Sequence, residues 1–392
     1  MTKNIKSKYN LPKSLRDLKP LVKWAGGKEK ELKHIVPLIP SNYEKYYEPF
    51  IGGGAVFFKT VENKPSFLND RSTELISLYK MIQNQNTVFL SHLENINESW
   101  FSLEEIVNSN RISFIENYKL FSKSVIDENQ IKNLFFDFIE THVDTFRKID
   151  KLQIDFDFFI KEIEKSIFNK VKRMKKIEHI KHILHDQDVY DNILGAIKSA
   201  YYMYIRRVYN KHQKYNISKE LYTAIFFFIR NYCYSGMFRY NKSGEFNVPY
   251  GGIGYNNKSL CSKISYFKNK ELLEQLDNTV IENLDFEVFL KKHCPKSKDF
   301  IFIDPPYDTE FSTYAKNIFD REDQIRLSNY LIKECKAKWM LVIKNTDFIK
   351  KLYDFPGINI MSFDKKYLVS FMNRNNKNVQ HLIITNYIPN RN

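Results

Sequence analysis

Apolar positions in the two terminal parts of the chain alternate between strand-like and helix-like patterns. In the N-terminal part they predict a strand at 46–50, a helix from Ala55, a strand at 66–68 and a helix through 75–82. In the C-terminal part they predict a strand at 300–304, a helix at 321–335, a strand at 338–344 and a late strand pair ending at 382–385. This α/β alternation predicts one doubly wound sheet built from both parts.

The segment between these parts has a different character. Residues 85–220 are rich in Lys, Asn, Phe and Ile, show helical spacing and contain few Gly or Pro residues, whereas 231–257 is loop-rich. We therefore predict a basic N-terminal arm at 1–20, an α/β core formed by 21–84 plus 270–392, and an inserted, mostly α-helical domain at 85–269.

Charge and composition narrow the class of protein. The chain of 392 residues carries 61 Lys and Arg against 46 Asp and Glu, a net charge of +15, which favours a polyanionic partner. Its longest apolar run, 224–229, is too short for a membrane helix, and the N-terminus lacks an apolar signal core. The four cysteines are widely spaced. We expect a soluble cytoplasmic monomer with reduced thiols.

A glycine turn follows the first predicted strand. Phe50-Ile51-Gly52-Gly53-Gly54 lies between a strand and a helix, where glycines allow close approach of a ligand to the backbone. It lacks the third glycine of a dinucleotide fingerprint, and Ala25-Gly26-Gly27-Lys28 lacks the spacing of a Walker loop. Asp70, at the end of the next strand, is placed either to accept ribose hydroxyls or to cap a helix.

The sequence Asp304-Pro305-Pro306-Tyr307 follows a buried-type strand and carries the most specific chemistry. An exocyclic amino group on an aromatic base is a poor nucleophile because its lone pair is delocalised. The Asp304 carboxylate and the Pro305 carbonyl can accept its two hydrogens, with the prolines fixing the backbone. Tyr307 then offers a face on which an extruded base can stack. The alternative is an ordinary strand end turned by two prolines.

Several sequence blocks together resemble the Dam-type (D12 class) N6-adenine DNA methyltransferases, including those that modify GATC in restriction systems. They are Leu21-Val22-Lys23-Trp24-Ala25-Gly26-Gly27-Lys28, the run from Tyr47 to Phe57, Asn69-Asp70, Asn283-Leu284-Asp285-Phe286, the tetrad at 304–307, and the segments 231–239 and 244–250. The resemblance implies a Rossmann-like methyltransferase core that uses S-adenosyl-L-methionine, with 85–269 as the target-recognition domain that binds double-stranded DNA.

The resemblance also implies roles for single residues. The cofactor would contact Trp24, Lys28, Phe50, Gly52, Gly54, Asp70, Asp285, Phe286 and Asp304, and the catalytic residues would be Asp304, Pro305, Pro306 and Tyr307. DNA would contact Ser235, Met237, Arg239 and Asn241. Arg239 is the candidate for reading a guanine edge, with GATC as the target sequence that the resemblance suggests, and a phosphate contact or an internal ion pair is an equal alternative.

Other features leave alternatives open. The chemistry of the tetrad would also suit an RNA adenine, and a non-catalytic DNA-binding scaffold would keep the same fold. Basic residues of the insertion, including Arg206, Arg207 and Lys211, interleave with tyrosines 201–215 and suit either phosphate contact or a solvated face. His179, His182 and His185 have no completing ligands, so we expect no metal. Within the inserted domain, residues 85–220 match no family block. A separately encoded restriction endonuclease is a further expected partner.

Overall fold

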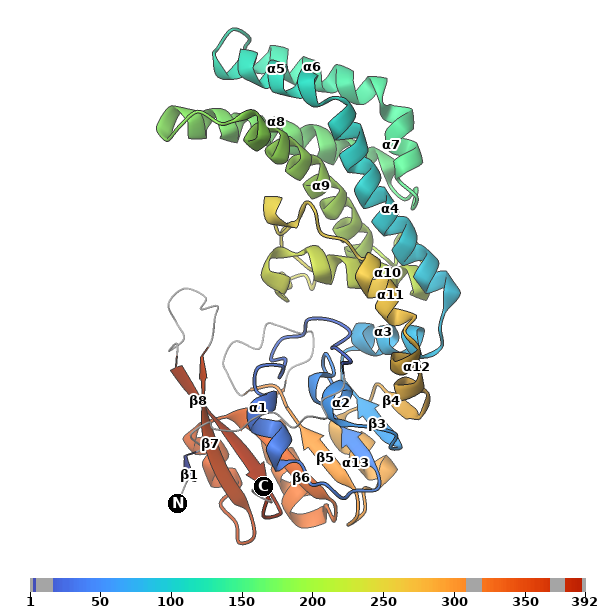
Figure 1. Ribbon diagram of the computed structural model, residues 1–392, viewed down its shortest axis with the longest axis vertical. Coiled ribbons are helices and arrows are strands. Elements are labelled where there is room, and N and C mark those ends of the chain that lie inside the picture. The colour runs from blue at the N-terminus through green and yellow to red at the C-terminus, as the bar shows by residue number, and fades with distance from the viewer. Residues whose placement is uncertain (1–2, 5–16, 308–318, 367–377, 390–392) are drawn as a thin grey trace. The chain divides into compact units, whose positions relative to one another are not determined.

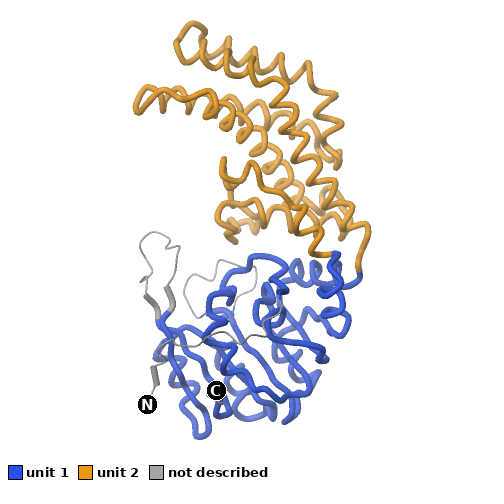
Figure 2. The backbone as a smooth tube through the Cα atoms, viewed as in Figure 1, with its two compact units in different colours: residues 1–84, 268–392 blue, residues 85–267 orange. Residues whose placement is uncertain are grey.

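The computed structural model describes residues 3–4, 17–307, 319–366 and 378–389. The chain divides into two compact units, one formed by 1–84 with 268–392 and the other by 85–267 (Figure 2). None of the helices in the described ranges combines the length and the apolar character needed to cross a lipid bilayer.

The first unit is built on an eight-stranded mixed sheet with the order β1-β7-β8-β6-β5-β2-β3-β4 (Figure 1). Its strands are β1 (Lys3–Asn4), β2 (Tyr46–Glu48), β3 (Ser66–Asn69), β4 (Thr279–Glu282), β5 (Phe300–Ile303), β6 (Lys338–Lys344), β7 (Asn359–Lys366) and β8 (Asn378–Thr385). The five strands from β6 to β4 are parallel, whereas β8 runs antiparallel to both β6 and β7. This arrangement confirms the predicted Rossmann-like α/β fold.

Helices cover this sheet. They are α1 (Leu32–Ile35), the 3₁₀ helix Val36–Leu38, α2 (Ala55–Thr60), α3 (Thr73–Gln83), α12 (Lys270–Asp277), α13 (Phe286–His293), α14 (Arg321–Asn329), the π-helix Tyr330–Glu334 and α15 (Asp347–Leu352). The core packs Phe289 of α13 and Leu327 of α14 against Ile301 of β5 and Trp339 of β6. All four residues of β5 are buried, as expected for a parallel strand with both faces covered.

The second unit is almost entirely helical among its described residues. It contains α4 (Thr87–Ser109), α5 (Arg111–Ser122), α6 (Glu128–Thr141), α7 (Val143–Ile149), α8 (Phe156–Ile180), α9 (Asp186–Asn210), α10 (Lys219–Tyr232) and α11 (Cys261–Phe267), with 3₁₀ turns at Tyr234–Gly236 and Ile253–Tyr255. Trp100 of α4 is fully buried, with ring centroids of Tyr232 and Phe228 of α10 at 4.6 and 5.6 Å. Aromatic packing therefore holds α4 and α10 together.

The two ends of the second unit meet. Phe89 at the start of α4 lies 6.4 Å from Phe267 at the end of α11, centroid to centroid. In the first unit, the last residue of α3, Gln83, is fixed against the segment that follows the insertion. Its Nε2 donates to the carbonyls of Leu276 in α12 and Thr279 in β4, each at 2.7 Å. The insertion thus begins and ends at neighbouring points of its own fold.

Several sequence predictions differ from the structure. Strand β4 and helices α12 and α13 were not predicted, and the predicted helix 321–335 ends at Asn329 and continues as a π-helix. The basic arm predicted at 1–20 lies largely outside the described residues; of its described part, Lys3–Asn4 pairs with β7 and Leu18 is buried. Short apolar segments such as 279–282 carry too little periodicity to be recognised.

Candidate active site

The predicted cofactor and catalytic residues of the first unit follow four neighbouring parallel strands. The glycine turn follows β2, Asp70 follows β3, Asp285 follows β4 and Asp304 follows β5. Because parallel strands bring their carboxyl ends to one edge of the sheet, these groups gather at that edge. Three carboxylates and a glycine turn in this arrangement can bind a ligand that combines hydroxyl groups and positive charge.

The glycine turn requires its glycines. Gly52 and Gly54 have φ angles of +51° and +80°, in the left-handed region that side chains disfavour. The Gly52 carbonyl accepts a hydrogen bond from the Tyr79 hydroxyl at 3.0 Å. A Cβ atom added to Gly52 would lie 3.0 Å from Cδ1 of Trp24, so the indole ring packs directly over the turn. Trp24 therefore lies against the turn that contains Gly52 and Gly54.

Asp70 is held by the backbone of the same turn. Its Oδ2 accepts from the Gly52 amide at 3.1 Å and its Oδ1 from the Ser72 amide at 2.9 Å. The helix that follows is capped by Ser72, whose hydroxyl accepts from Leu75 N at 3.3 Å, so Asp70 is not the cap. Burial raises the pKa of Asp70 to about 6, even though these backbone hydrogen bonds act in the opposite direction.

The raised pKa of Asp70 predicts a pH dependence of stability. The folded state binds this proton more tightly than the unfolded state, so the stabilising contribution is complete below about pH 4 and is lost as pH rises through about 6. Asparagine at this position does not ionise. We therefore expect the free energy of unfolding of Asp70→Asn, relative to that of wild type, to increase by roughly 1–3 kcal/mol when the pH is raised from 4.5 to 7.5. Urea unfolding at both pH values measures this difference, and an unchanged difference would contradict the assignment.

Asp285 and Phe286 lie just after the carboxyl end of β4, where α13 begins. Asp285 caps α13 by accepting from Glu287 N at 3.0 Å. Phe286 lies 5.6 Å from Phe50 and 5.7 Å from Phe319 between ring centroids, and Phe50 and Phe319 are 5.5 Å apart. Three mutually packed aromatic rings beside a carboxylate provide an apolar wall and a hydrogen-bond acceptor, which suit a purine.

Asn69 joins these two parts of the site. Its Nδ2 donates to the carbonyls of Pro49 and Leu284, both at 3.1 Å, and its Oδ1 accepts from Leu284 N at 2.8 Å. Asn69 is buried. One side chain thus fixes the loop that follows β2 to the loop that follows β4.

The tetrad follows β5, and its carboxylate is paired. Lys28 Nζ lies 2.5 Å from Asp304 Oδ1, 2.9 Å from the Gly26 carbonyl and 3.3 Å from the Tyr307 hydroxyl. The exposed fraction is 3% for Lys28 and 18% for Asp304, so the ion pair is largely shielded from water. Lys28 is therefore a neighbour of Asp304 and Tyr307, although it is far from both in sequence.

Two contacts fix the backbone and ring of the tetrad. The Pro306 carbonyl accepts from Nε2 of the buried Gln324 at 2.9 Å. The Tyr307 ring packs edge-on against His381 of β8, with centroids 5.4 Å apart. The contact with β8 shows that the antiparallel part of the sheet also positions the tetrad.

Glu48 is a residue near this site to which the sequence analysis gave no role. It is buried at the end of β2, where its Oε2 accepts from the Tyr46 hydroxyl at 2.6 Å. Burial raises its pKa well above the ordinary range, and the nearby charge of Asp304 acts in the same direction. The sequence signal that could have identified Glu48 is a carboxylate in an otherwise apolar strand.

The four predicted DNA-contacting residues lie in the second unit. Tyr240 and Phe246 form an isolated antiparallel bridge, and Asn247 N donates to the Arg239 carbonyl at 3.1 Å, so 239–247 form a hairpin. The exposed Arg239 donates from Nε to Asn247 Oδ1 at 2.8 Å. Asn241 Oδ1 accepts from the amides of Ser243 and Glu245, which shapes the turn.

Ser235 and Met237 lie just before this hairpin. Ser235 is exposed and has a φ angle of +53°, unusual for a residue with a side chain. The Met237 carbonyl accepts from Arg230 Nη1 at 2.8 Å, and the buried Arg230 guanidinium lies 3.1 Å from the centre of the Phe238 ring. Burial lowers the pKa of Arg230 to about 10. This buried arginine supports the segment that carries both residues.

The tyrosines of the insertion do not form an exposed aromatic surface. Tyr201, Tyr202 and Tyr204 are fully buried in the core of the second unit. The basic residues between and after them are partly engaged: Arg207 pairs with Asp155 at 2.7 Å and Lys211 with Glu245 at 2.7 Å. Of the two alternatives that the sequence leaves open, phosphate contact and a solvated face, neither can involve these buried tyrosines.

The three histidines do not share one helix, because α8 ends at Ile180 and α9 begins at Asp186. In the ranges that the structure describes, no group of three or more His, Cys, Asp or Glu side chains is placed to hold a metal ion.

Sequence comparison extends these observations. The sequence profile of D12 class N6 adenine-specific DNA methyltransferases matches residues 24–153 and 160–369. Together with the sheet order, this match places the protein among the Rossmann-like methyltransferases. The chain belongs to the D12 class N6 adenine-specific DNA methyltransferase family. The family expected from the motifs is confirmed, as is the class of enzyme, an adenine-specific DNA methyltransferase.

Individual relatives agree. The chain is 27% identical over 377 residues to the Type II methyltransferase M.CviBI of Paramecium bursaria Chlorella virus NC1A, covering 94% of this chain and 100% of that protein. It is 27% identical over 388 residues to the Type II methyltransferase M.MjaIII of Methanocaldococcus jannaschii, covering 95% and 100%. The retron Ec67 DNA adenine methylase of Escherichia coli is 32% identical over 154 residues, 37% of this chain and 50% of that protein. The similarity thus extends into residues 85–220, which the motifs alone did not relate to the family.

Proposed function

We propose that this enzyme transfers a methyl group from S-adenosyl-L-methionine to the 6-amino group of an adenine in duplex DNA. The observation that best supports this proposal is the position of Asp304 and Tyr307 beside Lys28. They lie at the edge of the sheet where the glycine turn, Asp70 and Asp285 also lie. The family supports the class of reaction. The choice of methyl donor and the role of each residue are our proposal.

The residues of the first unit fit S-adenosylmethionine. Asp70, held by the backbone of the glycine turn, would accept the ribose hydroxyls, and Asp285 with Phe286 and Phe50 would hold the adenine ring. Trp24 packs over Gly52 and would border the methionine part. When bound, this cofactor supplies an electrophilic methyl group on a sulfonium, whose positive charge suits an edge that carries several carboxylates.

Within the tetrad, Asp304 and the Pro305 carbonyl would accept the two hydrogens of the target amino group. This holds the amino lone pair out of conjugation and toward the methyl group. Lys28 occupies Asp304 Oδ1 at 2.5 Å, so it must share or leave that oxygen when the base enters. Tyr307 would stack against the extruded adenine.

The second unit is proposed as the target-recognition domain. Its hairpin presents the exposed Arg239, whose guanidinium is oriented by Asn247. An oriented guanidinium can read the two major-groove acceptors of guanine, and GATC is the proposed target that contains this base. The net charge of +15 supports binding to a polyanion. The Type II relatives support a separately encoded restriction endonuclease as partner.

Methylation of plasmid DNA tests the proposal. Purified protein is incubated with unmethylated plasmid and S-adenosylmethionine, and modified adenines are then located by long-read sequencing. We expect methyl groups on the adenine of one short motif. A matched RNA duplex and a reaction without S-adenosylmethionine serve as controls. Absence of modified adenine, despite binding of the cofactor, would contradict the proposed substrate, and transfer to RNA alone would replace it.

A further inference from the structure

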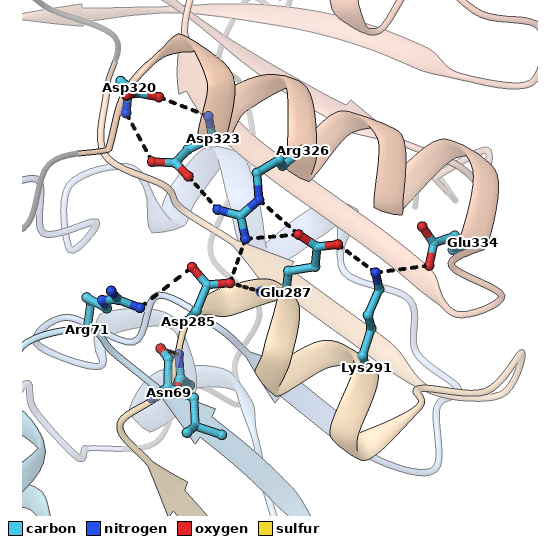
Figure 3. A network of polar contacts seen from close by, with 10 residues as sticks. Asn69, Arg71, Asp285, Glu287, Lys291, Asp320, Asp323, Arg326 and Glu334 are labelled. Atoms are coloured by element: carbon cyan, nitrogen blue, oxygen red, sulfur yellow. Dashed lines mark hydrogen bonds and ion pairs between the residues drawn. The ribbon is translucent and has the colours of Figure 1, made fainter.

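A network of charged side chains lies where α13 and α14 pack together (Figure 3). Arg326 of α14 is at its centre and contacts three carboxylates from two helices. Its Nη2 lies 2.8 Å from Asp285 Oδ1 and 2.9 Å from Glu287 Oε2, and its Nη1 lies 2.7 Å from Asp323 Oδ1. No local sequence pattern indicates a role for Arg326, because its contacts with Asp285 and Glu287 join segments distant in the chain.

The guanidinium also covers the aromatic part of the proposed adenine pocket. Its central carbon lies 4.9 Å from the centre of the Phe286 ring. Its neighbours in the network are themselves anchored, since Lys291 lies 2.6 Å from Glu287. Burial acts to lower the pKa of Arg326, but the hydrogen bonds to Asp285 and Glu287 outweigh it and raise the pKa above its ordinary value, which keeps the guanidinium charged.

The beginning of α14 is fixed to the same pocket. Asp320 caps the helix by accepting from the amides of Glu322 and Asp323, and the Asp323 carboxylate lies 3.3 Å from Asp320 N. Phe319, directly before the cap, packs against Phe50 and Phe286. Arg326 therefore projects from a helix whose start is held in place from two sides.

The two oxygens of Asp285 differ in their surroundings. Oδ1 accepts from Glu287 N at 3.0 Å and from Arg326 Nη2 at 2.8 Å. Oδ2 lies 3.7 Å from Arg71 Nη1, beyond hydrogen-bond distance. The exposed fraction of Asp285 is 24%, so a ligand can reach it. Arg326 thus fixes Oδ1, whereas Oδ2 makes the longer ion pair with Arg71.

We propose that Arg326 is a positioning residue for the cofactor: it holds Asp285 through Oδ1 so that Oδ2 accepts the 6-amino group of the cofactor's adenine. This inference rests on the proposed function, because it assumes that S-adenosylmethionine binds beside Asp285. Without the arginine, Asp285, Glu287 and Asp323 would repel one another, and Asp285 would lose its fixed orientation. Arg326 acts on the cofactor through Asp285 and takes no part in methyl transfer.

The test compares two ligands that differ at one group. S-adenosylhomocysteine carries the 6-amino group, whereas S-inosylhomocysteine carries an oxygen that cannot donate. Isothermal titration calorimetry gives the dissociation constant of each for wild type, Arg326→Ala and Arg326→Lys. We expect Arg326→Ala to weaken binding of the adenosyl ligand by about tenfold, the loss of one charge-assisted hydrogen bond, and to leave the inosyl ligand nearly unchanged.

Discrimination between the two ligands is the decisive readout, because a general structural effect would weaken both. Arg326→Lys keeps a cation but not the planar fork, so we expect it to recover part of the discrimination. Arg321→Ala is the matched control: Arg321 lies on the same helix and faces the Phe348 ring at 5.2 Å. It should bind both ligands as wild type does.

Three results would overturn the inference. They are unchanged affinity of Arg326→Ala for both ligands, an equal loss of its affinity for both ligands, and an Arg321→Ala variant that loses discrimination as much as Arg326→Ala does. If wild type binds neither ligand, the proposed cofactor fails, and the inference fails with it. Normal binding by wild type together with unchanged binding by Arg326→Ala leaves the proposed function intact and refutes only the role of Arg326.

Discussion

Replacement of Asp304 by alanine is expected to lower kcat for methyl transfer by roughly three orders of magnitude, because the target amino group loses the acceptor that holds its lone pair toward the methyl donor. The affinity for DNA should change little, since the proposed DNA contacts lie in the second unit. Single-turnover transfer of a radiolabelled methyl group, together with DNA binding measured by fluorescence anisotropy, separates the two effects. Near-normal transfer would refute the proposed role of Asp304.

Two variants guard against loss of fold in this experiment. Asp304→Ala leaves the shielded cation of Lys28 without its carboxylate, which can destabilise the protein. Asp304→Asn keeps the volume and an oxygen for Lys28 but removes the charge, and it should be nearly as inactive. Asp354→Ala, at an exposed aspartate of the same unit, should be fully active. Thermal unfolding of all three variants shows whether the loss of activity is chemical.

Gly54→Ala is expected to lower the free energy of unfolding by roughly 2–5 kcal/mol. Gly54 has a φ angle of +80°, and an added Cβ would lie 2.6 Å from both Phe58 Cε2 and the Tyr79 hydroxyl. The backbone strain and the clash therefore add, and the turn would move away from the position that the cofactor requires. Urea unfolding measures the change, and calorimetry with S-adenosylhomocysteine measures the loss of binding.

Gly357 provides a matched control for this substitution. It has a similar φ angle of +86°, but a Cβ there would meet nothing within 4 Å. Gly357→Ala should cost only the backbone strain, about 1–2 kcal/mol, and leave cofactor binding unchanged. Equal destabilisation by both substitutions would show that the contacts with Phe58 and Tyr79 do not constrain the turn.

The parts of this protein that could be predicted from sequence are those where local pattern and burial agree. The run 300–303 is apolar because both faces of β5 are covered, and the tetrad after it was placed correctly at the end of a strand. The glycine turn was predicted because positive φ angles and close packing demand glycine. In these segments the physical constraint acts on consecutive residues.

The features that were missed depend on tertiary contacts. Strand β4 has only four residues, and Val280 within it is 42% exposed, so its apolar pattern is too short to recognise. The contact between Arg326 and Asp285 joins residues of two different helices. The burial of Tyr201 and its neighbours could not be predicted, because a buried tyrosine and an exposed one look identical in sequence.

The meeting of the two ends of the second unit has a consequence for how the chain folds. Strands β3 and β4 pair in parallel, Ser66 with Thr279, although the whole second unit separates them in sequence. Closing so long a loop before any local structure forms would be slow. Once the second unit has folded, the contact between Phe89 and Phe267 turns it into a short connection. The insertion should therefore fold first, and the rate at which the sheet is completed should follow the stability of that helical unit.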